Sequence, residues 1–461
     1  MRVAYFSPLP PAASGIADYS AELLPHLGRH ADITLFVDPN APLDDALAGS
    51  FPVRDMASFG RLRDEFDVAL YHMGNDAEYH EAIWHVLRDH PGIVVVHEPL
   101  FYHFFQQLTV PRGDVEGFRR MLQDTYGELA ARRVISRLDD GTVNPVAYPL
   151  LEPVLHGALG AVVHSRHAAR QVAERCPEVP VATIPHHLSL PASFDGAVDR
   201  EAIRQRLGLA DRFVVGSFGF LTEWKRIPVA LRAVARLHDA HPEVAYCLVG
   251  DLRLYQDIGA LVDQVGLPAE VVRITGRTSL HEFLSYMAAA DVAVNLRYPT
   301  AGETSGTLIR LLGLGVPTIV SDVGAFSEFP DDVCAKVPVD SFEEETLVAI
   351  LRALADDRLL RQTLGTNARR HIRTHHTLEG SARAYAAFME QVVSGQARPA
   401  GAPGDAPDAR IVSDIAATLA GWGLTEHNDA LLSPIAEAMA HLGIGSDSDS
   451  LHQAHGTHDS S

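Results

Sequence analysis

A polar loop between two apolar segments carries the residue types best suited to chemistry. The sequence from Asn295 to Gly324 reads NLRYPTAGETSGTLIRLLGLGVPTIVSDVG, and a segment that predicts a helix begins near Thr304. The first N–H groups of a helix and the positive end of its dipole favour an anion, and glycines let the backbone approach it closely. We therefore expect a phosphate site beside a carboxylate. A helix whose hydroxyls only cap its own backbone is the alternative. The residues concerned are Gly302, Glu303, Thr304, Ser305, Gly306 and Thr307.

Two other glycine-bearing turns could reach the same anion. In VVGSFGFLTEWKRIP a predicted strand ends at Gly219, and Lys225 and Arg226 follow just before a helix. Two adjacent cations could neutralise a diphosphate, although such residues are also common at solvent-exposed helix starts. In PLPPAASGIADYS the first strand meets its helix at Gly15, where only a small residue would let the backbone touch a ligand. This turn is not GxGxxG, so the fingerprint of a nicotinamide-dinucleotide site is absent.

The elements that must position these turns alternate between short apolar strands and amphipathic helices, which is typical of parallel α/β sheets. We expect two Rossmann-like, doubly wound parallel-sheet domains, residues 1–190 and 191–376, facing each other across a cleft. The segment 188–201, LSLPASFDGAVDRE, predicts the linker between them. Ligands of such sheets bind at the carboxyl ends of the strands, where all three turns lie. The predicted strands are VAYFS, ITLFV, VALYH, IVVVHE, AVVHS and VATIP in the first domain, and FVVGSFGF, VAYCLVGD, VVRITG, DVAVNLR, PTIVSD and CAKVPVD in the second.

The C-terminal part is expected to be helical and then irregular. Residues 377–393 predict a helix that returns to the N-terminal domain. The composition of 394–409 predicts a flexible linker, and 410–443 a small helical extension. Residues 444–461 predict a disordered tail. The tail's histidines could bind metal adventitiously, but a solvated tail is the favoured interpretation; these residues are His452, His455 and His458.

Composition excludes several classes of protein. The chain has 461 residues and a formal net charge of −21, which argues against nucleic acid as the main partner. Its three cysteines match no disulfide framework or metal spacing, which fits a reducing compartment. The start, MRVAYFSPLPP, lacks the regions of a signal peptide, and no apolar stretch is long enough to span a membrane. We expect a cytoplasmic protein, with peripheral contact at the inner membrane face as a further possibility.

Taken together and in this order, these segments resemble the retaining nucleotide-sugar glycosyltransferases of the GT-B fold, family four, and in particular a bacterial branch. The resemblance covers roughly residues 1–393 and rests on SGIADY, VVVHEP, VVHS with IPHH, GFLTEWKR and GETSG…GLGVPTIVSDVGAFSE. It implies transfer of a sugar from a UDP- or GDP-linked donor to a glycan, lipid-linked or small-molecule acceptor. It also implies retention at the anomeric carbon, no metal and no other cofactor. The N-terminal domain would hold the acceptor and the C-terminal domain the donor.

The resemblance also implies roles for single residues. Lys225 would contact the diphosphate, Glu303 the sugar hydroxyls, and His97 the region of the reacting carbon. These three are the expected catalytic residues, although His97 could equally be a strand-end residue with a satisfied imidazole. The expected donor-binding residues are Gly15, Gly219, Lys225, Arg226, Glu303, Thr304, Ser305, Gly306, Thr307 and Arg310.

The sequence departs from the family pattern at two positions. The arginine common after the glycine of the GxLxxxK stretch is Phe220 here, so we expect Arg226 to supply the second charge. A second glutamate, which binds ribose hydroxyls in the family, is replaced by Arg310. An arginine can donate to ribose oxygens but cannot accept from both hydroxyls as a carboxylate does. Arg310 could instead point to solvent or pair with a nearby acid.

Two further groups of residues leave alternatives open. His72, Asn75 and His80 would face the cleft and could bind acceptor hydroxyls, or form an ordinary polar loop. The arginine-rich stretch 111–138 could approach an anionic membrane or a lipid-linked acceptor. Its interleaved acids favour a solvated helix face instead.

Three functions remain in view. An active transferase is favoured because Gly15, His97, Lys225 and Glu303 are all present. A non-catalytic or regulatory GT-B protein would explain the replaced glutamate. A nucleotide-sugar epimerase would need acid/base residues that cannot be placed from the sequence.

Overall fold

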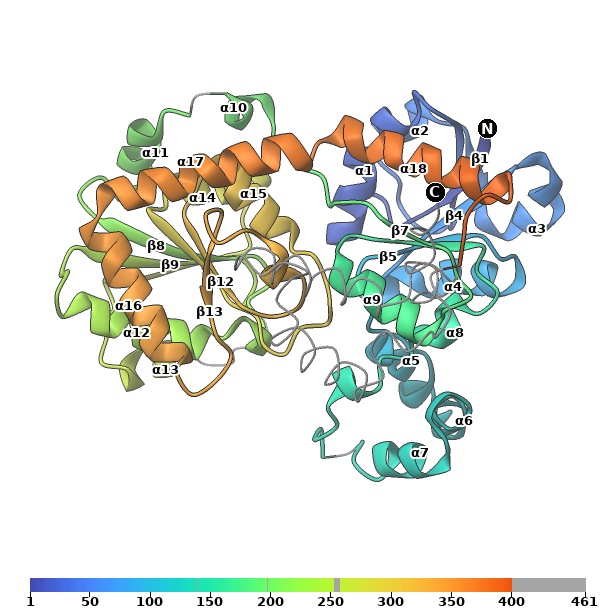
Figure 1. Cartoon of the computed structure of the whole chain (residues 1–461), viewed down its shortest axis with the longest axis horizontal. Coiled ribbons are helices and arrows are strands. Elements are labelled where there is room, and N and C mark those ends of the chain that lie inside the picture. Colours follow the sequence, from blue (N-terminus) through green and yellow to red (C-terminus); the bar gives the residue numbers. More distant parts are fainter. Residues whose placement is uncertain (139, 197, 253–257, 400–461) are drawn as a thin grey trace, which may run out of the picture. The chain divides into compact units, whose positions relative to one another are not determined.

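Two parallel sheets organise the chain, as the sequence predicts (Figure 1). The computed structural model describes residues 1–138, 140–196, 198–252 and 258–399. The first sheet has the strand order β3-β2-β1-β4-β5-β6-β7, and the second has the order β10-β9-β8-β11-β12-β13. The strands are β1 (Arg2–Phe6), β2 (Asp32–Val37), β3 (Val53–Asp55), β4 (Val68–Met73), β5 (Ile93–Val96), β6 (Gly160–Val163) and β7 (Val181–Thr183), then β8 (Phe213–Phe218), β9 (Val244–Val249), β10 (Val272–Gly276), β11 (Val292–Asn295), β12 (Thr318–Ser321) and β13 (Ala335–Val337).

The central strands are apolar throughout because helices cover both faces of each sheet. Every residue of β4, β5, β8 and β9 is buried. In the first sheet Val3 of β1 pairs with Ile33 on one side and Val68 on the other. All twelve strands named from the sequence are present, so that prediction is confirmed. The thirteenth, β3, has only three residues and was missed.

The helices lie on both faces of the two sheets (Figure 1). Those of the N-terminal part are α1 (Gly15–Leu27), α2 (Asp45–Ser50), α3 (Phe59–Leu62), α4 (Ala77–Asp89), α5 (Tyr102–Thr109), α6 (Val115–Tyr126), α7 (Glu128–Ile135), α8 (Leu151–Leu155) and α9 (Arg166–Arg175). Those that follow are α10 (Ala192–Asp195), α11 (Arg200–Leu207), α12 (Ile227–His238), α13 (Ile258–Gln264), α14 (Leu280–Ala289), α15 (Gly306–Leu314), α16 (Glu343–Asp356), α17 (Arg358–His375) and α18 (Leu378–Val393).

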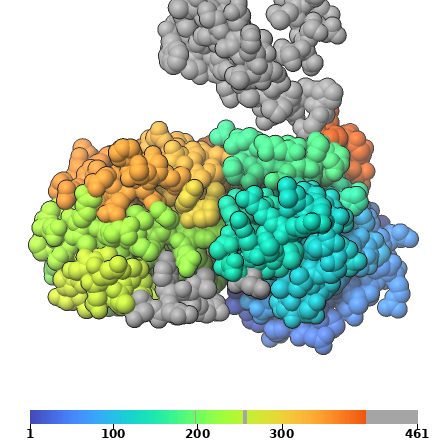
Figure 2. Space-filling model, turned by 90° about the horizontal axis from the view of Figure 1, so that it is seen from below, coloured from blue at the N-terminus to red at the C-terminus, as the bar shows by residue number. Residues whose placement is uncertain are grey.

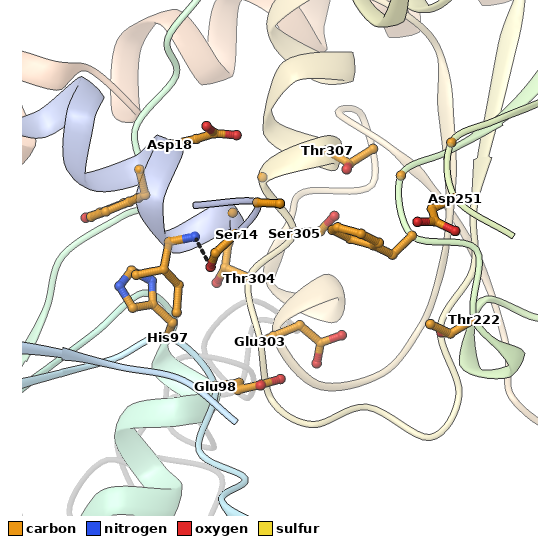
Figure 3. A pocket seen from close by; sticks show the side chains of 18 of the residues that line it. Ser14, Asp18, His97, Glu98, Thr222, Asp251, Glu303, Thr304, Ser305 and Thr307 are labelled. Atoms are coloured by element: carbon orange, nitrogen blue, oxygen red, sulfur yellow. Dashed lines mark hydrogen bonds between the residues drawn. The ribbon is translucent and has the colours of Figure 1, made fainter. Parts of the chain in front are cut away.

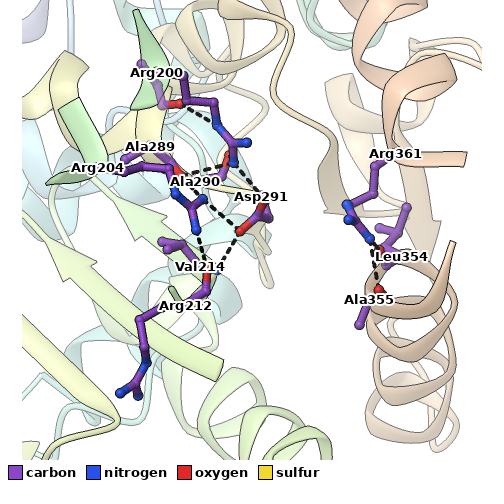
Figure 4. A network of polar contacts seen from close by, with 11 residues as sticks. Arg200, Arg204, Arg212, Val214, Ala289, Ala290, Asp291, Leu354, Ala355 and Arg361 are labelled. Atoms are coloured by element: carbon purple, nitrogen blue, oxygen red, sulfur yellow. Dashed lines mark hydrogen bonds and ion pairs between the residues drawn. The ribbon is translucent and has the colours of Figure 1, made fainter. Parts of the chain in front are cut away.

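The expected linker 188–201 is more ordered than its composition predicts. It contains α10 and leads into α11, which is held on the second sheet by the partly buried carboxylate of Asp291 (Figure 4). Arg200 and Arg204 approach the two oxygens of Asp291 at 2.7 and 3.0 Å, and one of these oxygens accepts the Val214 N–H at 2.8 Å. Burial alone would raise the pKa of Asp291, but the two guanidinium groups hold it below its usual value. This network ties the start of the second domain to β8.

The last helices connect the two halves. Helix α17 packs against α15, and α18 packs against α1. The hydroxyls of Tyr19 on α1 and Tyr385 on α18 lie 2.9 Å apart, and both side chains are buried. The predicted extension 410–443 and tail 444–461 lie outside the described residues, as does the predicted linker 394–409 beyond residue 399.

Candidate functional site

A cleft with a volume of about 1110 Å³ lies where the carboxyl ends of the strands from both sheets meet (Figure 3). The turn after β1, the end of β5, the ends of β8 and β9 and the loop after β11 all contribute to its wall. The sequence-predicted residues in the wall are Gly15, Asn75, His97, Gly219, Lys225, Glu303, Thr304, Ser305, Gly306, Thr307 and Arg310.

The loop after β11 delivers a helix N-terminus to this cleft. Helix α15 begins at Gly306, two residues later than predicted, because the Ser305 Oγ accepts the Leu308 N–H at 3.2 Å and makes Ser305 the N-cap. The hydroxyl of Thr304 is buried and has no hydrogen-bond partner in the described part of the chain. The loop therefore caps its helix, and the free Thr304 hydroxyl beside the helix N-terminus can donate to an anion. The anion site itself stays a prediction.

Lys225 and Gly219 form the opposite wall of this anion site. Lys225 is 7% exposed, and its Nζ donates to the Phe218 carbonyl. Burial, with a smaller contribution from nearby Arg297, holds the pKa of Lys225 well below its usual value. Gly219 has φ +96°, and a Cβ there would lie 3.1 Å from both the Lys225 Nζ and the Thr307 Oγ1. The glycine therefore keeps open the space between the amine and the start of α15.

A second helix N-terminus reaches the cleft from the first domain. Helix α1 begins at Gly15, and the Ser14 Oγ caps it by accepting the Ile16 N–H at 3.3 Å (Figure 3). Nothing lies within 4 Å of the position that a Gly15 Cβ would occupy, so the backbone here is open to a ligand. Two positive helix ends in one cleft favour an anion with more than one negative group.

Arg226 is not part of the cleft, which corrects the expectation that it supplies the second charge. Its Nε donates to the Glu343 Oε1 at 3.0 Å, and its second nitrogen also pairs with that carboxylate. Arg297, two residues after the end of β11, lines the cleft and lies near Lys225. Arg297 was missed in the sequence, although its place at a strand end was a usable signal.

Replacing Arg226 with alanine is expected to lower stability by about 3 kcal/mol while leaving nucleotide affinity unchanged. The substitution leaves the Glu343 carboxylate, whose side chain is only 6% exposed, without its ion-pair partner. Urea unfolding and a nucleotide titration would measure the two effects. Arg232→Ala is the matched control, because its pair with Glu344 is 45% and 31% exposed and should contribute less than about 1 kcal/mol. A large loss of nucleotide affinity in Arg226→Ala would show that Arg226 does take part in nucleotide binding.

Glu303 lies in the cleft but is already engaged by its own loop. Its Oε2 accepts the Ala301 N–H at 2.9 Å and the Thr300 hydroxyl at 3.0 Å, and its Oε1 lies 2.8 Å from the Arg297 Nε. Each carboxylate oxygen has two acceptor sites, so Oε1 can accept one further hydroxyl. The loop therefore holds Glu303 rigid without using up its capacity to bind a ligand.

Glu98 is a cleft residue that was not singled out in the sequence. It follows His97 at the end of β5, and its Oε1 accepts the Asn75 N–H at 3.2 Å. Burial and the nearby Glu303 raise its pKa to about 7, against the lowering effect of the Asn75 N–H. Figure 3 shows Glu98 and Glu303 in the same part of the cleft, contributed by different domains. A carboxyl group that titrates near neutrality can exchange a proton during a reaction.

Glu98→Gln is expected to flatten the pH dependence of stability. A raised pKa in the folded state means that the stability contributed by the neutral carboxyl is present below pH 4.5 and lost as the pH rises through about 7. The amide stays neutral at every pH. The free energy of unfolding of the variant should therefore exceed that of the wild type by up to about 3 kcal/mol at pH 8 and by little at pH 5. Urea unfolding at both pH values measures the difference. Parallel pH profiles for the two proteins would show that Glu98 does not titrate in this range.

His97 lines the cleft, but other histidines engage both of its ring nitrogens. His164 Nδ1 lies 2.9 Å from the Ile184 carbonyl, which only accepts, so His164 Nδ1 carries the hydrogen and its Nε2 is an acceptor. His97 must therefore donate from Nδ1 to this Nε2 at 3.3 Å, and accept at its own Nε2 from His72 at 3.0 Å. In this arrangement the His97 ring presents no free nitrogen to a ligand.

His72 and His80 are buried rather than exposed to the cleft, which corrects the expectation for two of the three polar residues near β4. His72 is 0% exposed and forms part of the histidine chain described above. His80 is 1% exposed, and its Nδ1 donates to the Asp76 carbonyl at 2.9 Å. Asn75 does line the cleft, but its side-chain oxygen accepts the Phe104 N–H at 2.9 Å.

Arg310, which the resemblance predicted to replace a second glutamate, pairs with an acid of the other domain. One of its guanidinium nitrogens lies 2.8 Å from the Glu22 Oε1, and the other Glu22 oxygen lies 3.2 Å from the His187 Nε2. Glu22 comes from α1, and both Glu22 and Arg310 line the cleft. The positive charge of Arg310 is thus paired with a carboxylate of the first domain.

The arginine-rich stretch is extensively paired with acids. Arg112 contacts both oxygens of Glu81 at 2.6 Å, and Arg119 and Arg132 each contact Glu128. In Figure 2 the segment that contains α5, α6 and α7 forms a continuous surface on the face shown. Within the described residues no helix is long and apolar enough to cross a membrane, and no group of three or more acidic, histidine or cysteine residues could hold a metal ion.

Comparison with known proteins relates the second half of the chain to a family. Residues 199–371 match the family model described as glycosyl transferases group 1. An α-D-kanosaminyltransferase of Streptomyces kanamyceticus is 27% identical over 214 residues, which are 45% of this chain and 54% of that protein. The chain thus aligns with about half the length of this curated relative.

Solved structures match over most of the chain. HepE of Anabaena in complex with UDP superimposes with a TM-score of 0.59 at 17% identity, covering 85% of this chain and 99% of that one. Sucrose-phosphate synthase of Thermosynechococcus elongatus gives a TM-score of 0.62 at 19% identity, covering 86% and 100%. At these identities the similarity concerns the fold, and it confirms the predicted GT-B arrangement of two parallel-sheet domains.

Proposed function

Since residues 199–371 match the family model of the group 1 glycosyl transferases, we propose that the chain transfers a sugar from a nucleoside diphosphate sugar to an acceptor hydroxyl. The donor is UDP- or GDP-linked, and the acceptor is a glycan, a lipid-linked sugar or a small molecule. The reaction retains the anomeric configuration and uses no metal ion or other cofactor. The UDP bound in HepE makes UDP the first nucleotide to test.

The observation that carries this proposal is the convergence of positive groups in one cleft. The N-termini of α1 and α15, the Lys225 amine and the Arg297 guanidinium all line it. When a glycosidic bond to a diphosphate breaks, negative charge develops on the departing phosphate oxygen. Helix ends and cations already in position stabilise that charge without reorganising, which lowers the barrier to bond cleavage.

Two carboxyl groups in the same cleft suit the sugar. Glu303 is held rigid by its loop and keeps one acceptor site, which can take a sugar hydroxyl. Glu98 faces the same region from the first domain, where the acceptor would bind. His97 then contributes through packing and through the orientation of its neighbours, since its nitrogens are occupied.

A second candidate is a GT-B protein that binds a nucleotide without turnover. It is favoured by the pairing of Arg310 with Glu22, because the carboxylate usual at position 310 is absent. Both candidates predict nucleotide binding, and only the first predicts sugar transfer or slow donor hydrolysis.

A thermal-shift titration with UDP, GDP, ADP and dTDP tests the proposal first. A ligand that binds only the folded state raises the melting temperature as its concentration passes its dissociation constant. We expect a shift with one of these nucleotides in the presence of EDTA. The corresponding sugar nucleotides are then tested for hydrolysis and transfer, and NMR of the product gives its anomeric configuration. No shift with any nucleotide would overturn the proposal; binding without any release of sugar would favour the second candidate.

A further inference from the structure

His186 lies at the anion site, although neither the motif analysis nor the reaction above uses it. It follows β7, lines the cleft, and its ring edge faces the start of α15. A Cβ built on Gly306 would lie 3.2 Å from the His186 Nε2, so this nitrogen is in contact with the first residue of the helix. The backbone of His186 is held in place because its carbonyl accepts the His376 Nδ1–H at 2.7 Å.

The hydrogen bond at the other ring nitrogen determines the tautomer of His186. Its Nδ1 lies 2.9 Å from the His187 carbonyl oxygen, and a carbonyl can only accept. Nδ1 therefore carries the hydrogen, and Nε2 of the neutral ring has only a lone pair. In the described part of the chain Nε2 has no hydrogen-bond partner. A lone pair directed at a helix N-terminus would repel an anion bound there, unless Nε2 also takes up a proton.

The free protein disfavours that proton. The groups facing the His186 ring are His187 on the same segment, His164 at the end of β6, Arg310 on α15 and the Tyr19 ring on α1, whose centroid is 5.0 Å away. Burial, reinforced by His187, His164 and Arg310, holds the pKa of His186 well below its usual value, against the raising effect of the His187 carbonyl. An anion at the start of α15 would reverse this balance, because it places negative charge beside the ring.

We propose that His186 is a proton-coupled ligand of the diphosphate: it takes up one proton from solvent at Nε2 when the nucleotide binds, and donates that N–H to a phosphate oxygen. This inference rests on the proposed function, because it needs a nucleoside diphosphate in the cleft. The protonated ring adds a cation from the first domain to those of Lys225 and Arg297. Because binding then takes up a proton, the affinity for the nucleotide would depend on pH.

Isothermal titration calorimetry with the nucleotide that shifts the melting temperature measures the proton directly. At pH 7.5, titrations in two buffers with different ionisation enthalpies give the number of protons taken up per nucleotide bound. The comparison is between the wild type, His186→Gln and the control His85→Gln, whose side chain is 52% exposed on α4. Glutamine can donate an N–H to a phosphate without first binding a proton.

We expect the wild type and His85→Gln to take up more protons per nucleotide bound than His186→Gln does. The difference should be up to one proton. Between pH 6 and 8 the wild-type affinity should fall by up to about tenfold per pH unit relative to that of His186→Gln. His186→Ala should bind more weakly than His186→Gln at pH 8, because it lacks a donor. Equal proton uptake in the wild type and His186→Gln would overturn this inference but leave the proposed function intact. If no nucleotide binds the wild type at all, the proposed function itself fails.

Discussion

Lys225→Met is expected to make the free protein more stable while removing its stabilisation by a nucleoside diphosphate. The Lys225 amine is buried and lies near Arg297, and both effects lower its pKa. A basic group whose pKa is lowered by folding destabilises the native state at every pH below its unfolded pKa, and the deficit grows as the pH falls toward the folded pKa. Replacing a buried charge with an apolar side chain of similar length typically stabilises a protein by about 1–4 kcal/mol or is neutral.

The same substitution removes a charge-assisted contact to the ligand. We expect nucleotide affinity and turnover to fall by at least about 100-fold, because the amine faces the start of α15 across the Gly219 gap. Thermal shift with and without nucleotide measures both effects in one experiment. Lys336→Met is the control: Lys336 pairs with Asp331 at 2.7 Å outside the cleft, so its nucleotide affinity should stay unchanged. A Lys225→Met protein that still binds the nucleotide as tightly as the wild type would exclude this amine from the anion site.

The largest loss of stability is expected from Gly250→Ala. Gly250 has φ +134°, and a Cβ there would lie 2.0 Å from the carbonyl oxygen and 3.0 Å from the nitrogen of Gly219. Both atoms belong to the backbone, so no side-chain rotation relieves the contact. The left-handed conformation and the overlap together should cost about 3 kcal/mol or more. The displaced Gly219 would also disturb the space between Lys225 and Thr307, so nucleotide binding should weaken.

Gly266→Ala separates the two contributions. Gly266 also has a positive φ, +72°, but nothing lies within 4 Å of its added Cβ. This variant therefore carries the conformational strain alone, about 1 kcal/mol, and should bind the nucleotide normally. Urea unfolding of both variants measures the difference. If Gly250→Ala were no less stable than Gly266→Ala, the backbones of Gly219 and Gly250 would not lie as close together as the structure places them.

Some of the residues that line the cleft also form contacts between the two domains. Glu22 and Arg310 join α1 to α15 across the cleft, and Glu328 accepts the backbone N–H groups of Arg166 and His167 at the start of α9. His186 adds a third contact, at Gly306. Of these three contacts, those of Glu22 with Arg310 and of His186 with Gly306 lie in the wall of the cleft.

The sequence by itself determined the strands, and it predicted an anion site in the loop after β11. Twelve strands were predicted from apolar periodicity, because a strand covered on both faces must be apolar along its length. The loop from Gly302 to Thr307 was identifiable because a carboxylate, hydroxyls and glycines at the start of a helix are local features. The strand that was missed, β3, has three residues and no pattern long enough to detect.

Only the tertiary structure decided which polar side chains reach the cleft and which nitrogens remain free. Arg226 and Arg297 are both cations near strand ends, but Glu343, 117 residues away in the sequence, pairs with the first, while the second lines the cleft. His97 was placed at the right strand end, yet His72 and His164 occupy its two nitrogens. The pairing of Arg310 with Glu22 likewise spans 288 residues. Hydrogen bonds and ion pairs of this kind depend on distances in space between residues far apart in the chain, and no local pattern encodes those distances.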